Sequence, residues 1–152
     1  IAGVASSKRG VERIRQIAST EMDGEKALLA NPFFRRKVAE LEMDLTALEF
    51  TELRSLAGAA AGKGPGPESS ILKIKGTEIQ QRLTELTLEA VGTYGAPYMG
   101  GVSNDNGSNE FPVGPDYATH AAATYFNMRK TSIYGGSNEI QRNIITKMIL
   151  GL

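Results

Sequence analysis

The apolar residues of the chain recur at helical intervals, and no stretch alternates strictly between apolar and polar positions. In the first 20 residues the apolar side chains recur three or seven positions apart, at Val4, Val11, Ile14 and Ile17. This spacing places them on one face of an amphipathic helix. The sequence EMDGE at 21–25 interrupts the pattern. The first helix is therefore predicted over residues 1–20.

A second helix is predicted from Asn31 and Pro32, because asparagine caps free backbone amides and proline is tolerated at the first helical position. Its apolar stripe alternates steps of four and three residues. The stripe consists of Phe34, Val38, Leu41, Leu45 and Leu48. The segment GKGPGPES at 62–69 ends this helix.

The third predicted helix has the clearest pattern. Its stripe consists of Leu72, Gly76, Ile79, Leu83, Leu86 and Ala90. Steps of four and three residues are typical of helices that pack nearly parallel in a bundle. A glycine inside a helix costs about 1 kcal/mol relative to alanine, so Gly76 predicts a close approach to a neighbouring helix.

The segment from Gly95 to Asp116 is dense in turn-forming residues, and we expect a long loop there, either functional or disordered. A fourth helix is predicted over Tyr117–Ser132. A fifth is predicted over Glu139–Leu150, with Ile140, Ile144 and Met148 facing inward. The fold class is therefore all-α, a four- to five-helix up-and-down bundle, with residues 1–152 forming a single domain. Because the chain starts without methionine on an uncapped helical pattern, we expect it to be a domain of a larger protein.

Composition excludes several classes of function. The 17 basic and 17 acidic residues balance, so the chain lacks the overall positive charge typical of a nucleic-acid-binding protein. It has no cysteine, which excludes disulfides, thiolate metal sites and a thiol nucleophile. No apolar run approaches the roughly 18 residues of a membrane span. We therefore expect neither a nucleic-acid partner nor a membrane partner.

Titratable residues suggest no metal site. His120 is the only histidine and follows Asp116 by one helical turn, so it is a candidate general base, although a histidine at the surface or a helix end is the favoured reading. One histidine cannot supply the pair that a di-iron bundle needs. Glu40, Glu42 and Asp44 are typical of a solvated helix face.

The segment Ile133–Glu139, with the sequence IYGGSNE, combines two glycines, a capping residue and a new helix. Free amides at a helix N-terminus can bind a pyrophosphate or another electron-rich ligand. The residues alone also fit a plain connection between two helices, which is the reading that physical arguments favour.

The run SIYGGSNEIQRNIITKMILGL at 132–152 resembles the C-terminal signature of the acyl-CoA dehydrogenase family. The stretch Leu72–Leu88 resembles the penultimate long helix of that family, and VAELEMDL at 38–45 resembles part of its second helix. The subgroup that the chain most resembles is bacterial, including large subunits of the pimeloyl-CoA dehydrogenase type. The resemblance implies that this chain is the C-terminal helical domain of an enzyme that also has an N-terminal helical domain and a middle β domain.

Several functional properties are implied by this resemblance. Family members remove hydrogens from C2 and C3 of an acyl-CoA, pass a hydride to FAD, and later pass electrons to an electron-transfer flavoprotein. A cytoplasmic homo- or hetero-oligomer is implied as well. By position in the family signature, Gly136 matches a substrate contact, and Ser137, Asn138 and Glu139 match FAD contacts. Gly95 matches a glycine of the family's flavin loop.

Two positions depart from the family pattern. Many members carry a catalytic glutamate where this chain has Gly135, so we expect no catalytic residue in this chain and a base upstream of Ile1. The family's Arg-x-x-Phe-Gly flavin element is replaced by ALLANPFFRRK at 27–37, and its contact is not carried over to Arg35 or Arg36. The alternative hypothesis is a catalytically inert helical interaction module, or a non-catalytic subunit, that retains the signature. A glutamate just upstream of Ile1 would favour the enzyme.

Overall fold

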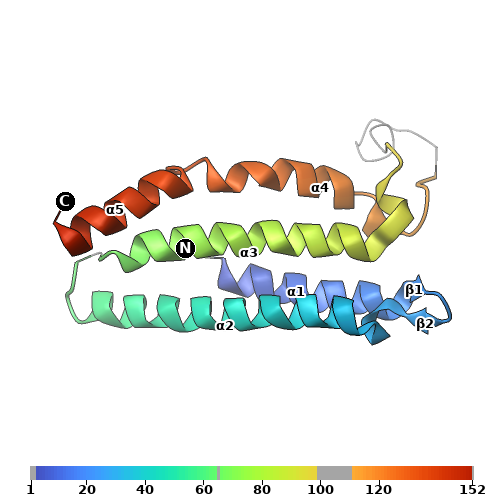
Figure 1. The fold of residues 1–152 in the computed structure, drawn as a ribbon, viewed down its shortest axis with the longest axis horizontal. Helices are drawn as coiled ribbons and strands as arrows, with labels where there is room; N and C mark the ends of the chain where they lie inside the picture. The colour runs from blue at the N-terminus through green and yellow to red at the C-terminus, as the bar shows by residue number, and fades with distance from the viewer. Residues whose placement is uncertain (1–2, 65, 99–110, 152) are drawn as a thin grey trace.

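The computed structural model describes residues 3–64, 66–98 and 111–151 (Figure 1). Within these ranges the chain is an all-α domain of five helices, as predicted. The helices are α1 Val4–Thr20, α2 Pro32–Ala60, α3 Glu68–Val91, α4 Ala121–Met128 and α5 Asn138–Leu150. Four short 3-10 helices join them, η1 Leu28–Ala30, η2 Gly92–Gly95, η3 Asp116–Ala118 and η4 Arg129–Ser132.

Helix α3 is the centre of the molecule and contacts each of the other four α-helices. Figure 1 shows α1 and α2 on one side of α3, whereas α4 and α5 follow one another along its other side. The order is up-and-down, because α2 returns alongside α1 and α3, and α4 and α5 return along α3. One helix therefore carries both the main core and the surface that supports the C-terminal segment.

The core is formed by the predicted stripes of the first three helices. Ile14 and Leu86 are fully buried, and Gly76 is buried on α3 as its position predicts. Asn31 caps α2 as predicted, since its Oδ1 accepts hydrogen bonds from the backbone N–H groups of Phe33 at 2.8 Å and Phe34 at 3.3 Å. Helix α1 begins at Val4, after Gly3, whose backbone is left-handed with φ 69°; the first two residues of the predicted helix lie outside the described ranges.

The interruption at residues 21–25 is part of a small hairpin. Strands β1 Met22–Asp23 and β2 Lys26–Ala27 pair antiparallel, with Met22 opposite Ala27. Tyr117 ties this end of the molecule together, because its hydroxyl donates a 2.5 Å hydrogen bond to Glu21 Oε1. This contact joins the end of α1 to η3.

The fourth predicted helix, Tyr117–Ser132, is not continuous. The segment instead contains η3, the short helix α4 and η4. The first residue of η4 is bonded to α3, because Arg129 Nη2 donates to Gln81 O at 2.7 Å and to Thr84 Oγ1 at 2.9 Å. Only Ala118 and Ala121 from η3 and α4 join the buried apolar core. Packing against α3 therefore determines the conformation here more than helical periodicity does.

The inward face predicted for the last helix is wrong. Ile140 and Met148 are each 52% exposed and Ile144 is 37% exposed. The least exposed residues of α5 are instead Gln141 and Ile145, which are half-buried, and Asn138, which is buried against α3. The reason is that polar partners on α3 attract the start of α5, so the apolar stripe does not determine which face is inside.

The predicted loop Gly95–Asp116 is described only in part, because residues 99–110 lie outside the described ranges. Among the described residues, no helix has the length and apolar character needed to cross a membrane.

Candidate functional site

The segment predicted to carry function is a tight turn between η4 and α5. We call residues 133–137 the signature turn. Gly135 and Gly136 both have left-handed backbones, with φ 68° and 85°, which favour glycine. A Cβ on Gly136 would lie 2.8 Å from Gln141 Nε2, whereas one on Gly135 would meet no atom within 4 Å. The turn is therefore closed beside Gly136 and open beside Gly135.

The start of α5 is capped by Ser137, whose hydroxyl oxygen accepts from the Ile140 N–H at 3.4 Å. Glu139 is exposed at the first turn of α5. Hydrogen bonds from its own backbone N–H and from the Ser137 hydroxyl lower the pKa of Glu139 below its usual value of 4.5. A carboxylate here is favoured by the helix dipole as well.

The Asn138 side chain is directed onto α3, where it forms hydrogen bonds with Lys73 and Thr77. It is 6% exposed. Its Oδ1 accepts from Lys73 Nζ at 2.8 Å, and its Nδ2 donates to Thr77 Oγ1 at 3.3 Å. The Thr77 hydroxyl donates in turn to Ile74 O at 2.9 Å. Both ends of the buried amide are therefore satisfied by α3.

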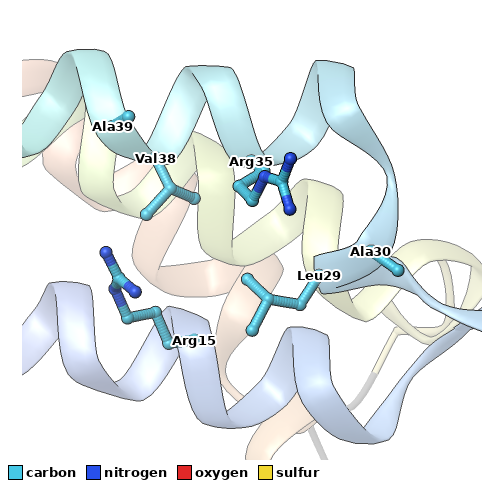
Figure 2. A pocket seen from close by; sticks show the side chains of 6 residues that line it. All are labelled: Arg15, Leu29, Ala30, Arg35, Val38 and Ala39. Atoms are coloured by element: carbon cyan, nitrogen blue, oxygen red, sulfur yellow. The ribbon is translucent and has the colours of Figure 1, made fainter.

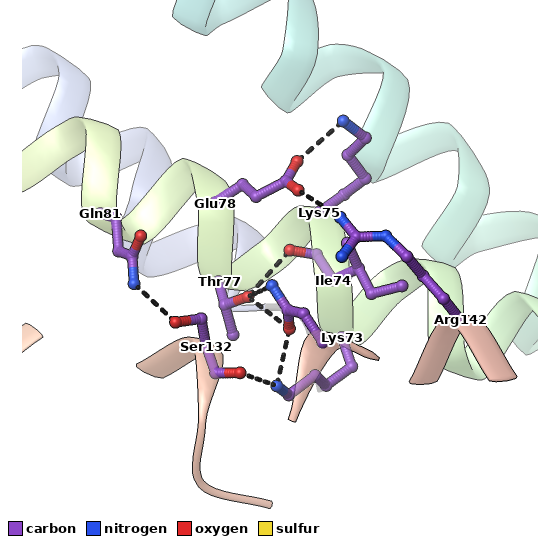
Figure 3. A network of polar contacts seen from close by, with 9 residues as sticks. Lys73, Ile74, Lys75, Thr77, Glu78, Gln81, Ser132 and Arg142 are labelled. Carbon is purple, nitrogen blue, oxygen red and sulfur yellow. Dashed lines mark hydrogen bonds and ion pairs between the residues drawn. The ribbon is translucent and has the colours of Figure 1, made fainter. Parts of the chain in front are cut away.

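The other end of the signature turn is held by the same helix. Lys73 Nζ donates to the backbone oxygen of Ser132 at 3.4 Å, and Gln81 Nε2 donates to the Ser132 hydroxyl at 3.3 Å (Figure 3). Gln81 Nε2 also donates to Arg129 O at 3.0 Å. Both ends of the signature turn are thus held by polar side chains on one face of α3, which we call the polar stripe.

Sequence reasoning missed this stripe. Lys73, Thr77 and Gln81 follow one another at four-residue steps, which places them on one face of α3 beside the apolar stripe. This four-residue spacing is the sequence signal from which the polar stripe could have been predicted. A polar stripe on an amphipathic helix ordinarily faces solvent. Only the tertiary structure shows that this one contacts the C-terminal segment of the chain instead.

Gly95 lies far from the signature turn. It ends η2, beyond the C-terminal end of α3, about 20 residues along the chain from Lys73 and Thr77. At 1.5 Å per residue this separation is roughly 30 Å. A Cβ on Gly95 would lie 2.5 Å from Leu88 Cδ1, so packing also favours glycine here. The structure therefore does not bring Gly95 to the other predicted cofactor residues.

The remaining candidates lie on the surface. His120 is exposed at the N-terminal end of α4, and Asp116 is exposed in η3. Glu40 and Glu42 form ion pairs, with Arg36 at 3.4 Å and Arg15 at 2.6 Å respectively. Within the described part of the chain, no group of three or more metal-ligating side chains could hold a metal ion.

A separate pocket of about 390 Å³ lies between α1 and α2 near the hairpin (Figure 2). Leu29 and Val38 provide its apolar side, and the guanidinium groups of Arg15 and Arg35 face it. Arg15 is already paired with Glu42. The pocket lies on the opposite side of α3 from α5, so it forms no part of the signature turn.

The described chain is an all-α domain of five helices whose last helix follows a glycine turn held by α3. Residues 1–150 match the family described as acyl-CoA dehydrogenase, C-terminal domain. The chain therefore belongs to the acyl-CoA dehydrogenase family, whose members are FAD-dependent oxidoreductases.

One curated relative and two solved structures illustrate what the chain is similar to. The acyl-CoA dehydrogenase IpdE1 of Mycobacterium tuberculosis is 26% identical over 151 residues, which cover 99% of this chain and 35% of that protein. The fold resembles the ChsE4–ChsE5 complex of M. tuberculosis, with a TM-score of 0.74, 21% identity and coverage of 100% of this chain and 37% of that one. It also resembles the FAD complex of PigA, with a TM-score of 0.72, 17% identity and coverage of 98% and 34%. The chain thus spans about a third of the length of these relatives.

Proposed function

We propose that residues 1–152 are the C-terminal helical domain of a longer FAD-dependent acyl-CoA dehydrogenase, which removes hydrogens from C2 and C3 of an acyl-CoA thioester. The observation that carries this proposal is the signature turn, which presents the start of α5 beside two exposed glycines. The family match over residues 1–150 supports it. The short coverage of the relatives supports a longer parent protein.

The residues of the turn fit a flavin cofactor. The first backbone N–H groups of a helix have no intrahelical acceptors, so the start of α5 can donate to an electron-rich ligand. Gly135 has open space around it, which allows a ligand to approach the backbone closely. We propose that Ser137, Asn138 and Glu139 contact FAD chiefly through backbone groups, since the Asn138 side chain is bonded to α3. When bound, FAD would accept the hydride that leaves C3 of the acyl group.

The base that removes the C2 proton is proposed to be a glutamate upstream of Ile1, because Gly135 has no side chain. The start of the described chain supports this placement. An added Cβ on Gly3 would lie 3.1 Å from Gln80 Nε2 on α3, and the next residue, Gln81, holds Ser132 at one end of the turn. Gly3 and the signature turn therefore lie beside the same part of α3, so a residue just before Gly3 would be close to the turn.

Gly136 is proposed to contact the thioester, as its position in the signature implies. Its backbone conformation and its closeness to Gln141 leave room for no larger residue without a local shift. Gly95, being distant from the turn, would have to serve a second cofactor-binding surface. An oligomer could supply such a surface, and the ChsE4–ChsE5 relative is itself a complex.

The finer parts of the proposal are the subgroup and the electron acceptor. We propose a bacterial enzyme similar to the large subunit of pimeloyl-CoA dehydrogenase, with an electron-transfer flavoprotein as acceptor. Measuring flavin reduction with thioesters of short, long and dicarboxylic acyl groups tests the substrate class.

The second candidate function is a non-catalytic subunit or an inert interaction module. Gly135 favours it, because the position that often holds the base carries no carboxylate. The two candidate functions differ in the role of the upstream glutamate, which is the catalytic base in the enzyme and has no catalytic role in the inert module.

The decisive experiment uses the full-length enzyme with its upstream glutamate replaced by glutamine. We expect the rate of flavin reduction by acyl-CoA to fall by roughly 10² to 10⁴-fold with full flavin content, as for loss of a general base. Glu25→Gln on the exposed hairpin is the matched control and should reduce at the parental rate. If the upstream variant also reduced at the parental rate, the assignment of the base would be wrong. A parent protein that takes up no FAD would favour the inert module.

Gly135→Glu provides a complementary test in the glutamine variant. The side chain has open space, although a non-glycine residue at φ 68° costs about 1 to 2 kcal/mol. We expect partial recovery of the reduction rate.

A further inference from the structure

Lys73 lies on α3 beneath both ends of the signature turn. Its ammonium group donates to Ser132 O at 3.4 Å, just before the turn, and to Asn138 Oδ1 at 2.8 Å, just after it. Gly135 and Gly136 between these ends are exposed and have no side chains. The position of the turn therefore depends on how its two ends are held.

The contact with Asn138 is the stronger of the two, because its 2.8 Å length lies in the range of a good hydrogen bond whereas the 3.4 Å contact with Ser132 O does not. A hydrogen bond from a charged donor is roughly twice as strong as a neutral one, and the acceptor Asn138 is only 6% exposed. Without Lys73, the buried Oδ1 keeps only the 3.4 Å contact to the Thr77 hydroxyl, which donates at 2.9 Å to Ile74 O. The start of α5 would then have to shift toward solvent to regain a good donor.

The positive charge of Lys73 near the N-terminus of α5 is not what the stability of that helix alone would favour. A cation beside a helix N-terminus is unfavourable, because the helix dipole places partial positive charge there. Glu139 offsets part of this cost, since Lys73 is among the charges that lower the pKa of Glu139. A lysine here suits a turn that must hold an electron-rich ligand.

We infer that Lys73 is a positioning residue, which acts through Asn138 and Ser132 to hold the signature turn where it contacts the flavin. This inference rests on the proposed function. In the proposed reaction Lys73 does not touch the reacting atoms. It acts only by holding the two ends of the signature turn.

The test compares three variants of the full-length enzyme. Lys73→Met keeps the aliphatic stem but removes the charge and the donors. Lys73→Arg keeps the charge and several donors. Lys75→Met is the matched control, because Lys75 is on the same helix, is exposed and pairs with Glu78 at 2.8 Å. For each variant, FAD affinity of the apoprotein is measured by titration, and amide hydrogen exchange is followed in the peptide that covers residues 133–141 without FAD.

We expect Lys73→Met to weaken FAD binding by about tenfold and to speed exchange at the start of α5, in proportion to the loss of one charge-assisted hydrogen bond. Lys75→Met should change neither quantity, and Lys73→Arg should recover most of both changes.

Two results would overturn the inference. One is Lys73→Met with FAD affinity and exchange equal to those of Lys75→Met. The other is an equal loss of affinity in Lys73→Arg and Lys73→Met. If the unsubstituted protein takes up no FAD, the proposed function is wrong, and the exchange measurement still decides whether Lys73 holds the turn.

Discussion

At the scale of single residues, the two glycines of the signature turn have different reasons to be glycine. Both have positive φ, but only Gly136 has a near neighbour, since the Gln141 amide would have to move to make room for a Cβ there. Gly135 is constrained by backbone conformation alone. Its open surroundings are what a ligand or a side chain from elsewhere in the protein could use.

Tyr117 leads to a prediction at the same scale. The hydrogen bond to Glu21 raises the pKa of the Tyr117 hydroxyl from about 10 to about 12. The folded state thus holds this proton more tightly than the unfolded state does. The contribution of the contact to stability is therefore fully present below pH 10 and is lost as the pH rises from about 10 to about 12.

The measurement is urea unfolding of the protein and of Tyr117→Phe across this pH range. We expect the difference in unfolding free energy between the two proteins to shrink as the pH rises. A constant difference would contradict the prediction. Comparison with the phenylalanine variant removes the effect of other groups that titrate in the same range.

At the scale of elements, α3 carries two stripes with different partners. Its apolar stripe packs against α1 and α2, and its polar stripe of Lys73, Thr77 and Gln81 holds the segment before α5. A helix that is half apolar would ordinarily turn its polar face to water. Here the polar face instead supports the candidate site, so core and site share one element.

Leu86 tests the importance of the apolar stripe. It is fully buried on α3, so Leu86→Ala should cost about 2 to 5 kcal/mol of unfolding free energy through lost burial and a residual cavity. Leu53→Ala is the matched control, because Leu53 is 53% exposed on α2 and should cost far less in the isolated domain. Denaturant unfolding measures both. Equal costs would mean that the core does not lie where the structure has it.

At the scale of the whole molecule, large apolar side chains are exposed on α2 and α5. On α2 they include Phe33, Met43 and Phe50, which are 62–71% exposed, and on α5 they include Met148, Ile149 and Leu150, which are 52–65% exposed. Exposed apolar side chains that gather on one face of a helix are typical of contact surfaces. Met43 and Phe50 meet this description, because they lie seven residues apart on α2 and line one shallow hollow. This part of α2 is therefore available to other parts of a larger assembly.

This exposure predicts that the isolated chain associates. The purified chain should be helical by circular dichroism and should form oligomers at micromolar concentration by light scattering. Phe50→Ser and Met148→Ser together should shift the population toward monomer. A monodisperse monomer for the unsubstituted chain would contradict the prediction.

Much of the fold was predictable from the sequence, because the responsible interactions are local. Helical periodicity located the stripes of the first three helices, and the Asn31 cap depends on amides two and three residues away. The glycines of the signature turn were recognisable for the same reason. The continuous fourth helix and the inward face of α5 were predicted wrongly, since both depend on contacts with α3.

The sequence by itself determined where helices form and where the chain turns, since those preferences depend on residues within a few positions of one another. Only the tertiary structure decided which face of α5 is buried, that the Asn138 side chain points into α3, and that Gly95 lies at the far end of that helix. Each of these depends on groups that are distant in sequence, as Lys73 is from Asn138. Side-chain periodicity shows that a helix has an apolar face and a polar face. The tertiary packing of the polar groups determines which other element each face contacts.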